Sequence, residues 1–107
     1  MITSKDEKIR FIYEYFEENG IKDDKEIKNV ESTPLMIRNN GLFNTLMYLK
    51  EKGGYEIFSI YYTKILNGGD LLPDILNKYK QLDQDYLAYT YEFYRFACQL
   101  KMYFKIV

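Results

Sequence analysis

Glycine-containing stop signals divide this chain into segments of helical length. Each stop follows a stretch in which apolar residues recur every three or four positions, and glycine often follows the last turn of a helix. The stops are Asn19-Gly20, Gly53-Gly54 and Asn67-Gly68-Gly69. No segment alternates strictly between apolar and polar residues beside a hairpin turn, so strands are not expected. The pattern predicts an all-α fold.

A length of 107 residues favours one domain over two, because it is enough chain to bury one hydrophobic core. Apolar residues make up 47% of the chain, enough to offset the entropy lost on folding, so disorder is not expected. We therefore expect residues 1–107 to form a single helical domain, compact and bundle-like, with about five helices.

The spacing of apolar residues places these helices at 5–19, 34–52, 55–67, 71–80 and 84–105. Ser4 and Glu7 form a capping-box pattern before the first helix, and Pro34 suits the first turn of the second. Gly41 lies inside the second helix, where glycine costs about 1 kcal/mol relative to alanine. We expect another backbone to pack closely against Gly41; a break in the helix is the alternative.

Aspartates mark the starts of the later helices. Asp70 is the expected cap of the fourth helix, and Asp83 or Asp85 is the expected cap of the last. The segment 21–32 is rich in charge and poor in apolar residues, so it is interpreted as a linker or a short exposed helix.

The last helix is apolar around nearly its whole circumference. Its apolar residues are Tyr86, Leu87, Tyr89, Tyr91, Phe93, Tyr94, Phe96, Ala97, Leu100, Met102, Tyr103 and Phe104. Such a helix requires burial on all sides, which so small a domain provides only in part. We expect part of its tyrosine-rich surface to meet another subunit. Cys98 is the only cysteine, so no intramolecular disulfide is possible, and it is expected to be a small buried side chain.

The sequence lacks the residues that most catalytic sites need. There is no histidine, which removes the commonest general base and metal ligand, and no glycine-rich phosphate loop. The acidic pairs Asp23-Asp24 and Asp83/Asp85 occupy expected caps or solvated segments rather than a metal site. We expect no catalytic residue, no metal, no cofactor and no enzymatic activity.

Charge is distributed unevenly along the chain. The net charge of −1 gives no general attraction to nucleic acid, but the stretch 95–107 contains Arg95, Lys101 and Lys105 and no acidic residue. Lys101 and Lys105 are one helical turn apart and could together contact a phosphate backbone, although solvation explains them equally well. Glu92 and Arg95 are expected to form only a surface ion pair.

Two blocks of sequence together form a recognisable pattern. The first is the run Pro34-Leu35-Met36-Ile37-Arg38-Asn39-Asn40-Gly41-Leu42, continued by Thr45 to Lys50. The second is Thr90-Tyr91-Glu92 followed by Leu100-Lys101. Both blocks resemble the small α-helical subunit of type III-B CRISPR RNA-guided effector (Cmr) complexes. The resemblance covers most of residues 34–105, although Gln99 stands where the family often has Trp.

The resemblance implies a structural subunit that stacks in copies beside other subunits, lines the channel holding guide and target RNA, and contributes no catalytic residue. Together with the charge pattern, it implies contact with the RNA backbone through Arg95, Lys101 and Lys105, with lesser help from Lys50 and Lys64. A helical adaptor or regulator that binds protein and no RNA is the alternative. A small subunit of the related type III-A complex is a third interpretation.

The chain is expected to be cytoplasmic and to make no contact with a membrane. Met1-Ile2-Thr3-Ser4 leads directly into charged residues rather than a signal peptide. No apolar run approaches the roughly 20 residues that a membrane-spanning helix needs.

Overall fold

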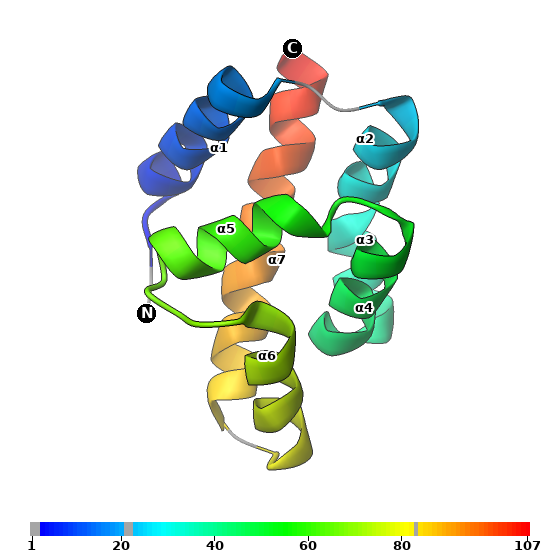
Figure 1. Ribbon diagram of the computed structural model, residues 1–107, viewed down its shortest axis with the longest axis vertical. Helices are drawn as coiled ribbons and strands as arrows, with labels where there is room; N and C mark the ends of the chain where they lie inside the picture. Colours follow the sequence, from blue (N-terminus) through cyan, green and yellow to red (C-terminus); the bar gives the residue numbers. More distant parts are fainter. Residues whose placement is uncertain (1–2, 21–22, 83) are drawn as a thin grey trace.

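The computed structural model describes residues 3–20, 23–82 and 84–107, and Figure 1 shows their arrangement. Within these ranges the chain forms seven helices and no strand. They are α1 (Lys5–Asn19), α2 (Asp24–Glu31), α3 (Thr33–Asn40), α4 (Leu42–Lys52), α5 (Tyr55–Lys64), α6 (Leu71–Lys80) and α7 (Gln84–Ile106). The all-α prediction is confirmed, but the described residues form seven helices where about five were predicted.

α7 is the longest helix, and the other helices pack around it (Figure 1). It packs directly against α1, α2, α3 and α6, while rings from α5 also reach it. Tyr61 of α5 stacks on Phe96 of α7 with ring centroids 3.9 Å apart, and Phe58 meets Phe96 edge-on. Burial of these rings provides both hydrophobic stabilisation and specific ring geometry. The core therefore lies along one side of α7.

The two sides of α7 differ in burial. Its buried residues are Glu92, Phe93, Phe96, Ala97 and Leu100. Its exposed large apolar residues are Leu87, Tyr91, Met102 and Ile106. The shorter helices thus cover α7 only in part, as the sequence predicted for so small a domain. Contact between the exposed side and another subunit stays a prediction.

The prediction of a continuous helix over 34–52 is wrong, because the chain turns at Gly41. α3 ends at Asn40 and α4 begins at Leu42, while Gly41 has φ +85° and ψ 165°, angles that residues with a Cβ rarely adopt. The prediction that another backbone approaches Gly41 closely is also wrong. A Cβ at Gly41 would first meet the Tyr86 hydroxyl, at an ordinary contact distance of 3.5 Å. Gly41 is needed for its backbone conformation, not for helix packing.

Tyrosine hydroxyls cap two helices that lack a side-chain cap of their own. The Phe43 amide in the first turn of α4 donates to the Tyr86 hydroxyl at 3.1 Å. The Leu72 amide in the first turn of α6 donates to the Tyr55 hydroxyl at 3.1 Å. Asp70 precedes α6 as predicted, but its side chain makes no capping bond. Each tyrosine satisfies an amide that has no partner within its own helix.

Other helix ends agree with the sequence to different degrees. The capping box is confirmed, since the Glu7 amide donates to Ser4 Oγ at 3.1 Å and the Ser4 amide donates to Glu7 Oε1 at 3.2 Å. α2 shows that most of the segment 21–32 is a short helix rather than a linker. α5 ends before the predicted position 67.

None of the described helices combines the length and the hydropathy needed to cross a membrane.

Only one of the two predicted caps of α7 lies among the described residues. Asp85 lies within the first turn of the helix rather than at its cap, and Asp83 lies outside the described residues. An acidic side chain in a first turn still interacts favourably with the positive end of the helix dipole.

Candidate nucleic-acid interface

α3 and α7 enclose a groove of about 380 Å³ that brings together cations from distant parts of the chain. It is lined by Pro34, Leu35 and Arg38 of α3 and by Tyr94, Cys98, Lys101, Met102 and Lys105 of α7. Three of these residues are cationic, and none of the described residues that line it is acidic. Two of the predicted RNA-contact residues, Lys101 and Lys105, therefore share a groove with Arg38, which was not among the predicted contacts.

The spacing along each helix explains why these side chains meet. Tyr94, Cys98, Lys101 and Lys105 are separated by three or four residues, so they lie along one face of α7. Arg38 lies one turn after Leu35 and Pro34 on α3. Because α3 packs on α7, the two faces form the walls of one groove. Lys101, Lys105 and Arg38 are exposed, as phosphate contact requires.

Arg95 lies beside a neighbouring hollow of about 230 Å³ that Lys5 and Lys8 also line. Its Nη2 lies 3.4 Å from Glu92 Oε2, so part of its charge is paired. Cys98 lines both this hollow and the groove, and it is half-buried rather than buried as predicted. Arg95 is thus adjacent to the groove without lining it.

Lys50 and Lys64 lie away from the groove. The Lys50 ammonium sits over the Tyr55 ring, 5.2 Å from its centroid. Lys64 lines a different hollow together with Glu14 and Glu18 of α1. Lys101 and Lys105 therefore lie together in the groove. Lys50 and Lys64 do not line it.

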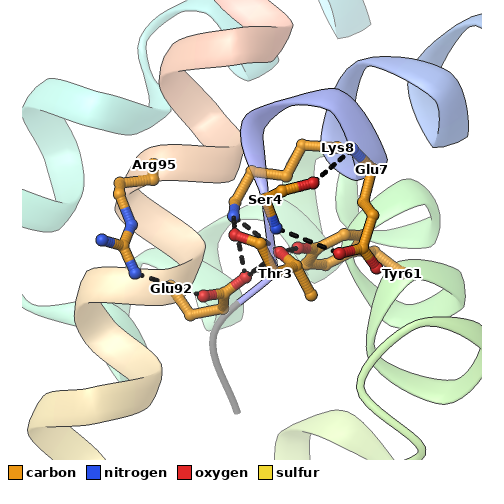
Figure 2. Close-up of polar contacts among 7 residues, drawn as sticks. All are labelled: Thr3, Ser4, Glu7, Lys8, Tyr61, Glu92 and Arg95. Atoms are coloured by element: carbon orange, nitrogen blue, oxygen red, sulfur yellow. Dashed lines mark hydrogen bonds and ion pairs between the residues drawn. The ribbon is translucent and has the colours of Figure 1, made fainter.

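Figure 2 shows a buried polar cluster that joins α1, α5 and α7. Lys8 Nζ lies 3.0 Å from Glu92 Oε1, and the two residues are only 2% and 1% exposed. The Tyr61 hydroxyl donates to the same carboxylate oxygen at 2.8 Å, and the Thr3 hydroxyl donates to it as well. Lys8 also donates to the Thr3 carbonyl oxygen at 2.7 Å. The expectation of a mere surface ion pair at Glu92 is wrong, because its main partner is buried with it.

The partners of Glu92 keep it charged despite its burial. Burial alone raises the pKa of Glu92, but hydrogen bonds from Thr3, Tyr61 and Lys8 and the charge of Lys8 outweigh burial and lower it. Burial in the same cluster raises the pKa of Tyr61. Because Glu92 is fully bonded and shielded from solvent, it is suited to holding three helices together rather than to transferring protons with a substrate.

One feature of the sequence, the isolated acidic residue Glu92, could have indicated this buried cluster. Glu92 is the only acidic residue within the predominantly apolar part of α7 that begins at Tyr86. A lone acid in a helix that packs on several others requires a buried partner. The signal does not identify that partner, because Lys8 lies on another helix far away in sequence.

No group of three or more histidine, cysteine or acidic side chains is placed to hold a metal ion within the described ranges.

Residues 5–101 match a family model described as CRISPR-associated protein (Cas_Cmr5). The match includes the buried Lys8–Glu92 pair and the groove as far as Lys101. No curated protein and no solved structure gives a significant match to the chain.

Proposed function

Because the chain belongs to the CRISPR-associated Cas_Cmr5 family, we propose that it is a non-catalytic small subunit of a type III-B CRISPR ribonucleoprotein effector complex. In this role it stacks with other subunits, including copies of itself, and helps to line the channel for guide and target RNA in antiviral defence. The family match extends over most of the chain and supports the assignment to a CRISPR complex.

The observation that carries the RNA part of the proposal is the groove between α3 and α7, whose described lining contains no acidic residue. Arg38, Lys101 and Lys105 reach it from two helices, so their charges face the same ligand. Lys and Arg side chains bind phosphates without reading sequence, which suits a subunit that must accept any guide. A net charge of −1 gives the isolated chain little general attraction to RNA, so it should bind RNA weakly by itself and more tightly within the assembled complex.

The chemistry of the chain supports a structural rather than catalytic role. The sequence has no histidine, and the ion pair of Lys8 and Glu92 is buried and bonded within the protein. Activation of water or stabilisation of a developing oxyanion requires such groups to face the substrate.

Exposed apolar residues favour protein contacts in addition to RNA. Leu82, in the turn between α6 and α7, is 90% exposed, and Leu87 and Tyr91 are exposed on the following helix. Aromatic and large apolar side chains are enriched in subunit interfaces. We propose that these residues contact neighbouring subunits. Their exposure also favours the alternative function, a helical adaptor that binds protein and no RNA.

Replacing Arg38, Lys101 and Lys105 together with Gln is expected to weaken target-RNA binding by the assembled complex and to flatten its salt dependence by about one unit of slope per lost phosphate contact. The measurement is RNA affinity at several salt concentrations, after confirming that the variant enters the complex. A matched control replaces Lys50 and Lys64, which lie elsewhere on the surface, and should leave the slope unchanged. An unchanged slope in the triple variant would place the RNA on another face.

A further inference from the structure

We propose that the groove between α3 and α7 holds an unstacked base of single-stranded RNA against the ring of Tyr94. This inference rests on the proposed function and adds a preference for unpaired over paired RNA. It follows from the combination of an aromatic ring, apolar walls and cations in one groove.

Tyr94 differs from most tyrosines of the chain in having no aromatic or hydrogen-bonding partner among the described residues. It has no ring contact, hydrogen bond or ion pair with any described residue, although it is half-buried and lines the groove. By contrast, Tyr61, Tyr62 and Tyr86 each contact another ring and form a hydrogen bond. Part of the Tyr94 ring packs against the core, but because the ring has no aromatic or polar partner, its exposed part is available to a ligand.

The walls of the groove suit a flat aromatic ligand with an attached phosphate. Leu35 and Met102 are exposed apolar side chains on opposite helices, and both line the groove with Tyr94. A volume of about 380 Å³ is in the range that accommodates a small-molecule-sized group such as a nucleoside. Arg38, Lys101 and Lys105 line the same groove, so phosphates beside the bound base meet cations.

This arrangement distinguishes single-stranded from double-stranded RNA. A duplex keeps its bases stacked and paired, so it can reach the cations but cannot place a base on Tyr94. Among the described residues that line the groove there is no acidic or amide side chain to read the edge of a base, and Arg38, Lys101 and Lys105 are assigned to phosphates, so binding should depend little on base identity.

The test uses the full chain at low salt, with a single-stranded oligouridine of about ten nucleotides and an RNA duplex of the same length. Tyr94→Leu is expected to lower affinity for the single strand about tenfold without altering the salt slope, because stacking carries no charge. Affinity for the duplex should not change. Tyr94→Phe should bind like the wild type, which separates stacking from loss of the hydroxyl or of folding.

Tyr91→Leu is the matched control, because Tyr91 is 67% exposed one turn earlier on α7 and does not line the groove. It should keep full affinity. Irradiation of the same oligomer made with 5-bromouracil should crosslink Tyr94. Unchanged binding by Tyr94→Leu, an equal loss in Tyr91→Leu, or a crosslink outside the groove would overturn the stacking proposal.

The two proposals fail in different ways. If Tyr94→Leu binds normally while the triple Gln variant loses salt dependence, base stacking is wrong and the RNA-lining role stands. If the triple variant keeps the salt slope of the wild type, the groove is not the RNA-contact face and both assignments to it are overturned.

Discussion

Replacing Glu92 with Gln is expected to lower the free energy of unfolding by about 3–5 kcal/mol, although the side chain keeps its shape. The substitution leaves the Lys8 ammonium buried without its carboxylate partner, which lies 3.0 Å away in the native protein. Breaking one side of a buried pair costs far more than the pair contributes overall, because the remaining charge stays out of water. Urea unfolding at neutral pH measures the loss.

A double-mutant cycle provides the control for this prediction. In the double variant Lys8→Met, Glu92→Gln no charge remains in the cluster, so its loss of stability should be clearly smaller than the sum of the two single losses. Simple additivity, or a loss below about 1 kcal/mol for Glu92→Gln, would contradict a strongly coupled buried pair.

The same pair predicts a pH dependence. The pKa of Glu92 is lowered in the folded protein, so the unfolded chain takes up this proton first as the pH falls. The stabilisation by Glu92 is complete above its ordinary pKa of about 4.3 and is lost as the pH drops through the lower folded value. The stability difference between wild type and Glu92→Gln should therefore stay level from neutral pH to about pH 5 and shrink as the pH falls below about 4. A difference that stays constant below about pH 4 would contradict this origin.

Replacing Gly68 with Ala is expected to destabilise the protein by about 3 kcal/mol, because the added methyl group has no room. A Cβ at Gly68 would lie 2.2 Å from Cζ of the Tyr62 ring. That ring cannot move aside easily: Tyr62 is 2% exposed, and its hydroxyl donates to Asp74 Oδ2 at 2.9 Å. It also contacts the rings of Tyr89 and Phe93.

Gly69→Ala is the matched control for the clash. The nearest atom to a Cβ at Gly69 is the Asp74 carboxylate oxygen at 3.4 Å, an ordinary van der Waals distance, so no neighbouring atom has to move. Its effect should stay within about 0.5 kcal/mol, as for ordinary surface substitutions. The measurement is the melting temperature of each variant in thermal unfolding, and Gly68→Ala should melt at the lower temperature. Equal melting temperatures would show that Tyr62 and the segment around Gly68 accommodate the added methyl group without loss of stability.

Features that depend on nearby residues could be predicted from the sequence. The capping box at Ser4 and Glu7 and the bounds of α1 and α6 depend on bonds within one helical turn, so local patterns are sufficient. The break between α3 and α4 at Gly41 could not be predicted from nearby residues alone. The first turn of α4 is capped by the Tyr86 hydroxyl, 43 positions further along the chain, and no local pattern reveals that bond.

The candidate site could be predicted only in part for the same reason. Lys101 and Lys105 were found because they are one turn apart in a stretch without acids. Arg38 joins them only through the packing of α3 on α7, which is a long-range contact. Lys50 and Lys64 look equivalent to these residues in sequence, yet their helices direct them elsewhere.

The buried pair and the groove are linked through α7. Glu92 faces Lys8 of α1 and Tyr61 of α5, so the cluster fixes the rotation of α7 about its axis. That rotation determines which residues face α3, and it leaves Tyr94, Lys101 and Lys105 in the groove. A stable cluster on one side of the helix thus positions the proposed RNA contacts on another.

The most direct test of the proposed role is to purify the chain from its source cell together with whatever is bound to it. We expect several larger protein partners and a short RNA of guide length, and we expect the Arg38, Lys101, Lys105→Gln variant to retain those protein partners while binding target RNA more weakly. Recovery of the same protein partners with no RNA would contradict the account and support a helical adaptor instead.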